Sequence, residues 1–340
     1  MDPGIPVPPQ FYGGIERVIY DVAQQYVALG HSVTLVAGPN SKSPGRLIVY
    51  GKNGPQKPDI DLQLLNNLYN VHKIIRKEIK NHDVIHNFGR LIFLLPFLKS
   101  DIVKVQTYMR YVNRKNIKWF DLFKPKSLTY TAVSDFIANT GRTPKSSWLT
   151  VYNCAPINQY RFNDKVADDA PLVFLGRLER CKGAHSAIEV AKRSNHKLII
   201  AGNISDIEHE KRYFYNEIKP LIDGEQIVYV GRVDDAQKNT LLSNAKALLS
   251  PVEWMEPFPV IIPEAYACGT PVLAFDDGGM REGIIQGVTG FISTNVDEMT
   301  EQIKDIHRLN RHECRKKAER DYSDLKIAND YLSVYKNGND

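Results

Sequence analysis

Two glutamates, Glu256 and Glu264, flank the segment Pro-Phe-Pro-Val-Ile-Ile-Pro and are the first candidates for chemistry in this sequence. On one continuous helix, eight positions would separate them by roughly 12 Å, at about 1.5 Å per residue. That distance is too long for two carboxylates that share one bond, but it suits the two ends of a polyhydroxylated ligand. The prolines predict that a loop presents Glu256 and that a helix contains Glu264. The alternative is an unrelated loop acid and a solvated helix acid, and the spacing alone does not separate the two.

Two further segments contain residue types that bind phosphate. Gly13 and Gly14 precede a predicted helix, whose first backbone N–H groups could receive an anion. Residues 176–183 follow a predicted strand and precede a helix, which places Arg177 and Lys182 at the carboxyl end of that strand. Two cations there can neutralise a diphosphate, and the Arg fork suits its oxygens. The alternatives are an ordinary turn for the first segment and a solvated basic loop for the second.

The elements that must position these residues alternate in type along the chain. Short apolar, β-branched runs predict strands, and amphipathic segments between them predict helices. Such alternation is typical of parallel sheets covered on both faces. The predicted strands are residues 32–37, 83–86, 102–105, 130–133, 172–175, 197–200, 227–230, 247–249 and 272–275, and the predicted helices are residues 15–29, 62–80, 184–193, 206–222, 235–245 and 325–335.

We therefore expect an α/β protein of two Rossmann-like, doubly wound domains that face each other across a cleft, with ligands at the carboxyl ends of the strands. A polar, weakly patterned segment at residues 153–170 marks the linker. We expect the first strand of the N-terminal domain to be missing. Four prolines among the first ten residues cannot form a central strand, because each lacks a ladder donor.

Composition limits the class of protein. A chain of 340 residues suits two domains, and 43% apolar with 24% charged residues is typical of a soluble globular protein. The longest apolar run, residues 91–98, contains a proline and is too short to span a membrane. The sequence opens on no leader pattern, and its four cysteines are scattered, so we expect a cytoplasmic protein with free thiols.

Positive charge is concentrated in one part of the chain. The formal net charge is +5, but residues 73–126 contain 13 Lys and Arg against 4 Asp and Glu. Within them, residues 108–126 interleave basic and aromatic side chains. Such a surface could lie on the cytoplasmic face of an anionic membrane or bind a lipid-linked substrate, and the alternative is a solvated loop. We do not expect nucleic acid as a partner, because no recognised binding module accompanies the basic stretch.

Taken in order, these segments resemble the family-four retaining glycosyltransferases of the GT-B fold, and the resemblance covers most of the chain. No single segment is specific, but the ordered set is hard to obtain by chance. The segments are residues 8–17, 30–34, 133–138, 176–178 with 182–183, 230–233, 256–258, 264–272, 278–282 and 288–292.

The resemblance implies a retaining, metal-independent glycosyltransferase of polysaccharide or glycoconjugate biosynthesis. The donor would be a nucleotide-diphosphate sugar, a UDP-sugar before a GDP-sugar, and the acceptor a glycan, a lipid-linked sugar or a small molecule. No cofactor and no bound metal are expected, because cationic side chains would neutralise the diphosphate. Residues 1–160 would bind the acceptor, residues 161–320 the donor, and a helix within residues 321–340 would cross back to the first domain.

The same resemblance implies a role for each site residue. The expected catalytic residues are Glu256, which would stabilise positive charge at C1 of the donor sugar, and Arg177 and Lys182, which would hold the diphosphate. Glu264 would bind the ribose hydroxyls. The expected donor-binding residues are Gly13, Gly14, Arg232, Val233, Phe258, Pro259, Val260, Ile261 and Glu264, and the acceptor-side residues are Arg110, Tyr111 and Arg114.

Two departures from the family pattern concern the donor sugar. Where family members often have His-x-His, this chain has His86-Asn87-Phe88, which leaves His86 as a histidine of the core. Pro259 replaces a common glycine and removes a backbone donor. Two other functions stay open: a catalytically inactive, nucleotide-binding scaffold related to glycosyltransferases, and a nicotinamide-dependent oxidoreductase, which would require the Gly-x-Gly-x-x-Gly pattern that is missing here.

Overall fold

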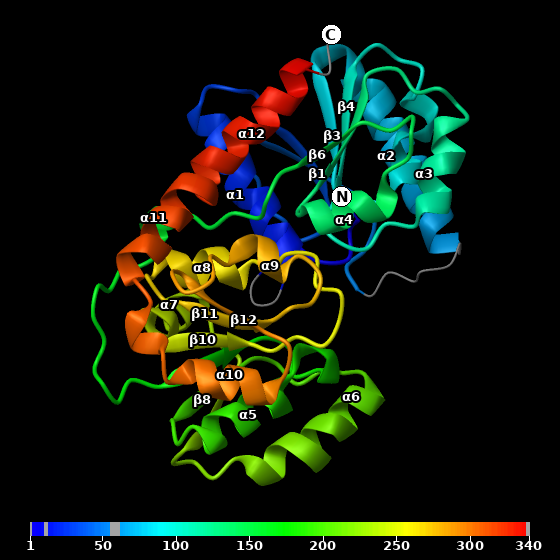
Figure 1. Ribbon diagram of the computed structural model, residues 1–340. Coiled ribbons are helices and arrows are strands. Elements are labelled where there is room, and N and C mark those ends of the chain that lie inside the picture. The colour runs from blue at the N-terminus through cyan, green and yellow to red at the C-terminus, as the bar shows by residue number, and fades with distance from the viewer. Residues whose placement is uncertain (1, 10–12, 55–61, 338–340) are drawn as a thin grey trace. The chain divides into compact units, whose positions relative to one another are not determined.

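The computed structural model describes residues 2–9, 13–54 and 62–337 of the chain. Its contacts divide the protein into two compact units (Figure 1). Unit 1 comprises Met1–Asn153 and Asp324–Asp340, and unit 2 comprises Cys154–Ser323. From the sequence we expected the divisions at residues 160 and 320.

Unit 2 is built on a six-stranded sheet in which every neighbouring pair is parallel. The strand order is β12-β11-β10-β7-β8-β9. The chain therefore adds strands outward in one direction from β7 and in the other direction from β10. The strands are β7 (Leu172–Leu175), β8 (Leu198–Ala201), β9 (Ile227–Gly231), β10 (Ala247–Ser250), β11 (Val272–Phe275) and β12 (Gly290–Ser293).

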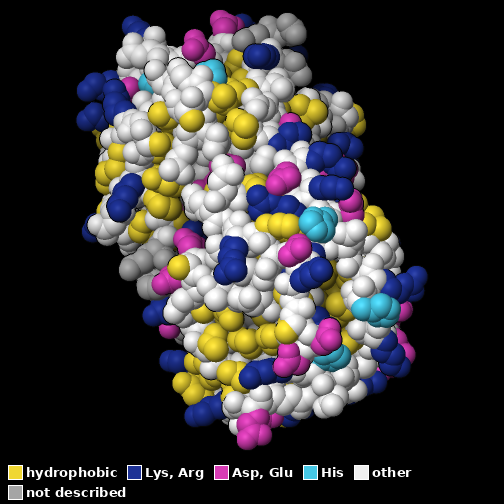
Figure 2. Space-filling model, turned by 90° about the vertical axis from the view of Figure 1, so that its left-hand side faces the viewer, with side chains coloured by type: hydrophobic (Ala, Val, Ile, Leu, Met, Phe, Trp, Pro, Cys, Tyr) yellow, Lys and Arg dark blue, Asp and Glu magenta, His cyan; other side chains and the backbone are white. Residues whose placement is uncertain are grey.

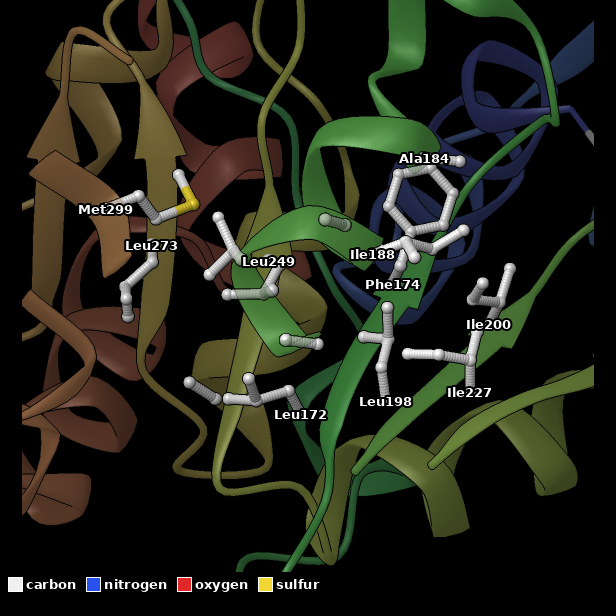
Figure 3. Close-up of a cluster of buried hydrophobic side chains, with 14 of the residues drawn as sticks. Leu172, Phe174, Ala184, Ile188, Leu198, Ile200, Ile227, Leu249, Leu273 and Met299 are labelled. Carbon is white, nitrogen blue, oxygen red and sulfur yellow. The ribbon is translucent and has the colours of Figure 1, made fainter. Parts of the chain in front are cut away.

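Helices cover both faces of this sheet because its strands are apolar on both faces. Alternate side chains such as Phe174 and Leu249 point toward Ile188 and Met299 of two helices, and Figure 3 shows this cluster. In Figure 1, α8 lies on the opposite face from α5 and α10. The helices are α5 (Ala184–Arg193), α6 (Glu208–Tyr213), α7 (Asp235–Ser243), α8 (Ile261–Ala267), α9 (Met280–Gly283), α10 (Val296–Ile303) and α11 (Arg311–Asp321).

The helix predicted over residues 206–222 is not one regular helix. The α-helix ends at Tyr213, and a π-helical turn (Phe214–Ile218) and a 3-10 turn (Lys219–Leu221) follow. Pro220 lies in the last turn, where its ring and its missing N–H are incompatible with a continuing α-helix.

The described part of unit 1 contains a parallel sheet in the order β3-β4-β5-β6 and a parallel pair, β1-β2. The sequence did not predict β2 and β6 here or β12 in unit 2. The strands are β1 (Thr34–Ala37), β2 (Arg46–Val49), β3 (Val84–Asn87), β4 (Val103–Tyr108), β5 (Leu128–Ala132) and β6 (Trp148–Thr150), and the helices are α1 (Gly14–Ala28), α2 (Leu62–Glu78), α3 (Arg114–Asp121), α4 (Asp135–Gly141) and α12 (Asp324–Asn337).

As predicted, no strand precedes α1 within residues 2–9, and residues 10–12 lie outside the described part of the chain. The proline-rich segment packs against β1 as irregular chain instead. Val7 is fully buried beside Ala37, and its N–H donates to Ser41 Oγ at 3.0 Å. A Cβ on Gly38 would lie 2.2 Å from the carbonyl oxygen of Pro3, so only glycine permits this approach.

The surface mixes charges of both signs. On the face that Figure 2 draws, basic and acidic side chains lie among apolar ones. None of the helices in the described ranges is long and apolar enough to cross a membrane.

A buried chain of hydrogen bonds joins α12 to the rest of unit 1. The hydroxyls of Tyr26 and Tyr335 are 2.7 Å apart, and Tyr335 Oη is 2.7 Å from His86 Nδ1. His86 Nε2 is 2.6 Å from Thr107 Oγ1. Burial lowers the pKa of His86 to about 3, so the ring is neutral near pH 7. His86 is therefore a core histidine, and the Phe88 ring packs on it with centroids 4.0 Å apart.

This buried ring predicts a pH-dependent stability. In the unfolded chain His86 regains an ordinary pKa near 6.5 and binds a proton that the folded protein does not bind. The free energy of unfolding should therefore fall as the pH falls from 6.5 toward 3. In urea unfolding series, His86→Gln should remove up to about 1.4 kcal/mol per pH unit of this dependence. Equal slopes in both proteins would contradict the assignment.

Candidate functional site

The candidate site lies at the carboxyl ends of β7 and β10, the two neighbouring strands from which the chain proceeds in opposite directions. In open parallel sheets this point leaves a crevice for a ligand, because the chain continues from the two strands to helices on opposite faces of the sheet. The loop after β7 contains Arg177 and Lys182, and the loop after β10 contains Glu256. All three expected catalytic residues thus follow the two central strands of unit 2.

Two backbone contacts bring these loops together. The N–H of Glu253 donates to the carbonyl oxygen of Cys181 at 2.8 Å. Gly183 has a φ of +75°, and a Cβ there would lie 1.8 Å from the carbonyl oxygen of Pro251. The glycine is required for this approach, which places Lys182 beside Glu256.

Lys182 and Trp254 hold one oxygen of the Glu256 carboxylate. Lys182 Nζ and Trp254 Nε1 both donate to Glu256 Oε2, each at 2.5 Å. The ammonium also lies 4.7 Å from the centre of the Trp254 ring, within the range of a cation–π contact. The Glu256 residue is only 6% exposed. No residue that the structure describes donates to Oε1.

The loop at Gly278 and Gly279 fixes the backbone of Glu256. The N–H of Gly279 donates to the Glu256 carbonyl oxygen at 2.7 Å. Gly278 has a φ of +66°, and a Cβ there would lie 2.2 Å from the same oxygen. A glycine is thus needed at this position for the carboxylate to stay in place.

Arg177 is oriented by an acid in its own loop. Its Nη1 forms an ion pair with Glu179 Oε1, which also accepts from Ser205 Oγ at 3.3 Å. Glu179 is buried, whereas the Arg177 side chain is partly exposed. The ion pair therefore fixes the orientation of the Arg177 guanidinium, which remains accessible to an anion.

Glu264 forms a second buried charge pair. As the prolines predicted, Glu256 lies in a loop and Glu264 in the first turn of α8. Lys238 of α7 donates to Glu264 Oε1 at 2.5 Å, and Tyr160 Oη donates to the same oxygen at 2.9 Å. The two glutamates therefore have different lysine partners and lie in separate hydrogen-bonded clusters.

The other expected donor-binding residues of unit 2 differ in how they could reach a ligand. The side chain of Phe258 is buried against Tyr322, with ring centroids 5.5 Å apart, so only its backbone can contact a donor. Pro259 has no N–H, and Val260 and Ile261 are half-buried at the start of α8. Arg232 is exposed and Val233 half-buried directly after β9, the edge strand, rather than beside β7 and β10.

The expected glycine pair and acceptor-side residues belong to unit 1. Gly13 caps α1 with a φ of +149°, where a Cβ would lie 2.9 Å from Glu16 Oε2. Burial raises the pKa of Glu16, and the positive charge of Arg110 acts in the opposite direction. Tyr111 is exposed, and Arg114 Nε donates to the Arg142 carbonyl oxygen at 2.6 Å. Gly14 is the first residue of α1.

Sequence reasoning missed several side chains that hold the site residues in place. Glu179 lies within the segment of residues 176–183, and its spacing of two residues from Arg177 is a signal for the Arg177–Glu179 ion pair. Lys238 sits in a predicted helix and carries no local signal of burial. The missed residues are Tyr160, Glu179, Lys238 and Trp254. Among the described residues, no three His, Cys, Asp or Glu side chains are grouped so that they could hold a metal ion.

The contact between Gly278 and Glu256 predicts a site-specific effect. Gly278→Ala should displace the Glu256 backbone and impair both folding stability and activity. Gly287→Ala is the matched control, because Gly287 has a φ of +72° but a Cβ there would meet no atom within 4 Å. Gly287→Ala should lower the free energy of unfolding only by the strain of a left-handed backbone, about 1–2 kcal/mol. Equal losses of stability and turnover in the two variants would contradict the role of the contact.

Comparison with known proteins shows the family to which the chain belongs. The family described as "Glycosyltransferase Family 4" matches residues 12–148, and "Glycosyl transferases group 1" matches residues 157–321. The lipopolysaccharide 1,2-N-acetylglucosaminetransferase of Salmonella typhimurium is 26% identical over 188 residues, which cover 52% of this chain and 49% of that protein. The chain spans about half the length of that relative and of the uncharacterized Klebsiella pneumoniae protein that it also matches.

Solved structures share the fold over nearly the whole chain. Sucrose-phosphate synthase from Thermosynechococcus elongatus has a TM-score of 0.77 at 18% identity and covers 99% of this chain and 95% of its own. HepE of Anabaena, solved with UDP and glucose, has a TM-score of 0.73 at 18% identity. The match covers 95% of this chain and 96% of the HepE chain. Because two consecutive family matches and the two Rossmann-like units agree, the chain belongs to the family-four-like glycosyltransferases of the GT-B fold.

Proposed function

We propose that this protein transfers a sugar from a nucleotide-diphosphate sugar to a glycan, lipid-linked or small-molecule acceptor, with retention of configuration at the anomeric carbon. The observation that supports this proposal best is the Lys182–Glu256 pair, with Arg177 in the same loop, at the carboxyl ends of the two central strands. It combines cations for a diphosphate with a carboxylate for a sugar.

Arg177 and Lys182 are suited to a leaving diphosphate. The Lys182 ammonium has three N–H donors. One of them donates to Glu256, and the ammonium also lies over the Trp254 ring. The remaining donors can bind phosphate oxygens, and the Arg177 fork can bind two at once. Charge that develops on the diphosphate as the glycosidic bond breaks would meet cations already in position, which is electrostatic preorganisation. These cations would do the neutralising work of a metal ion.

Glu256 is suited to the sugar side of the same bond. Its Oε2 is occupied by Lys182 and Trp254, so Oε1 is the oxygen available to a ligand. A carboxylate there can accept from a sugar hydroxyl and stabilise positive charge at C1. Transfer with retention would follow if the acceptor arrived on the face that the diphosphate leaves, with the diphosphate oxygen taking the acceptor's proton.

A UDP-sugar is the donor that we favour over a GDP-sugar. The similarity to HepE, whose structure contains UDP and glucose, supports this choice. A catalytically inactive, nucleotide-binding scaffold is the second candidate. Two observations favour it: Phe88 is packed on His86 at the position where family members often have a second histidine, and Pro259 offers no N–H.

Donor binding and turnover test the two candidates together. We expect UDP to raise the melting temperature more than GDP does, and NAD to leave it unchanged. With a UDP-sugar panel, the wild-type protein should release UDP in the presence of an acceptor. Glu256→Ala should lower kcat by at least about 100-fold, as loss of one transition-state contact does, while UDP binding persists.

Glu189→Ala, which removes an exposed acid of α5, is the control and should retain full turnover. Near-wild-type turnover of Glu256→Ala would refute the catalytic role. Binding without any turnover, over the whole panel, would favour the inactive scaffold. Stabilisation by NAD alone would favour an oxidoreductase.

One surface of unit 1 fits the anionic membrane that the charge distribution suggested. We define the α3 surface as the exposed apolar residues Trp119, Leu122 and Phe123 with the exposed Lys115, Lys118, Lys124 and Lys126. Leu122 is 73% exposed and Trp119 is 46% exposed, whereas Ile117 and Phe120 anchor the helix in the core. Apolar side chains surrounded by lysines are typical of helices that lie at a lipid headgroup boundary. A peripheral position at the cytoplasmic membrane face is therefore part of the proposal.

Vesicle flotation tests the α3 surface. The protein should float with vesicles of anionic lipid at low salt and sediment free at high salt, because the lysine attraction is screened. The double variant Trp119→Ser, Leu122→Ser should float less than wild type. Ile207→Ser, which removes an apolar residue of unit 2 that is 51% exposed, should float as wild type does. No flotation of the wild type would remove the membrane from the proposal.

A further inference from the structure

Tyr160 and Lys238 lie outside the short segments on which the family resemblance was based, and both hold the Glu264 carboxylate by the same oxygen. Tyr160 Oη and Lys238 Nζ both donate to Oε1, at 2.9 Å and 2.5 Å. Within the described chain no donor reaches Oε2. We propose that Tyr160 and Lys238 are positioning residues that present Glu264 Oε2 to the ribose of the donor, and that they thereby set selectivity for ribonucleotides over deoxyribonucleotides. This inference rests on the proposed function.

Burial of Glu264 and its two partners makes the orientation of the carboxylate rigid. Glu264 is 4% exposed and Lys238 is 9% exposed, so neither charge can be left without its partner. Lys238 Nζ also lies 3.2 Å from Asp235 Oδ1 and 5.8 Å from the centre of the Tyr160 ring. Two bonds to Oε1 from different directions therefore fix the plane of the carboxylate.

Neighbouring contacts lock the three segments that supply this cluster. Asn239, the residue after Lys238, donates to the Gln159 carbonyl oxygen at 2.6 Å and accepts from the Arg161 N–H at 3.0 Å. These two bonds clamp the chain on both sides of Tyr160. Arg315 then donates to the carbonyl oxygens of Tyr160 and of Ala267, the last residue of α8, at 3.3 Å and 2.7 Å. Helices α7 and α8 and the Tyr160 segment are thus tied to one another by hydrogen bonds.

A carboxylate held in this way discriminates by what its second oxygen accepts. A ribose offers two vicinal hydroxyls, and Oε2 has two lone pairs for them. An analogue that lacks one hydroxyl leaves part of the buried carboxylate without its partner, and sites of this kind reject such analogues strongly. If the Glu264 carboxylate could rotate, it could turn Oε2 away from the missing hydroxyl and much of the rejection would be lost.

The test is the ratio of the dissociation constants for 2′-deoxy-UDP and UDP, measured by calorimetry. We expect the wild type to prefer UDP, and Tyr160→Phe and Lys238→Met each to lower the ratio by about tenfold, the effect of losing one bond to a charged group. Tyr160→Phe removes only a hydroxyl, so it keeps the test valid if Lys238→Met does not fold. Tyr266→Phe is the matched control. It removes a buried tyrosine hydroxyl from α8, the helix of Glu264, but that hydroxyl is hydrogen-bonded to Thr289 and not to Glu264.

The outcomes separate this inference from the proposed function. A ratio that falls in Tyr160→Phe but not in Tyr266→Phe supports the inference. A ratio that falls in Glu264→Ala while Tyr160→Phe and Lys238→Met keep the wild-type value overturns it and leaves the proposed function standing. A wild type that binds neither UDP nor GDP overturns the proposed function, and the inference with it.

Discussion

Burial of carboxylates at the edge of a parallel sheet is the constraint on which unit 2 depends. Glu256 and Glu264 are nearly inaccessible to water, and a buried charge is tolerated only when it is paired and hydrogen-bonded. Each has a lysine from another part of the chain at 2.5 Å. The local backbone follows from this requirement. The left-handed Gly183 lets the loop after β7 approach the loop after β10, and Asn239 ties α7 to the segment of Tyr160.

The two pairs share a geometry that suits a ligand with two different ends. In each pair a lysine and one further donor, Trp254 or Tyr160, occupy a single carboxylate oxygen. The second oxygen is thereby held in a fixed direction without a protein partner among the described residues. For the proposed donor, one such oxygen would serve the sugar and the other the ribose. Of the two lysines, Lys182 lies in the loop of Arg177 and Lys238 does not. The diphosphate would therefore be bound beside the Lys182–Glu256 pair, which would also contact the sugar.

Much of the fold could be predicted from the sequence, because long parallel-sheet patterns are strong local signals. The helix at α5 and nine of the strands lie where hydrophobic periodicity placed them. Strands β2, β6 and β12 were not predicted, although six of the nine predicted strands are equally short. Strand β2 has no fully buried residue, and β12 begins with a glycine, which is depleted in strands. The predicted helix over residues 206–222 is α-helical only to Tyr213, and Pro220 accounts for the loss of α-helix in its last turn.

The site could be predicted only as far as its motifs extend. Glu256, Glu264, Arg177 and Lys182 lie in segments that sequence alone singles out, and the order of the segments identified the family. The partners of these residues could not be predicted in the same way. Lys238 is 26 positions before Glu264 and Tyr160 is 104 positions before it, and pairing at such distances is decided by the packing of helices rather than by local pattern.

The departure from the family pattern at Phe88 has a physical reason within unit 1. His86 bonds to Tyr335 through Nδ1 and to Thr107 through Nε2, so both of its nitrogens are used to join α12 to β3 and β4. The Phe88 ring completes this packing against His86 and Tyr331, with centroids 4.0 Å and 6.1 Å away. A histidine at position 88 would place a polar ring in that apolar contact and need a partner of its own. The apolar residue stabilises the docking of α12, and under the proposed function it leaves more of the sugar contact to Glu256.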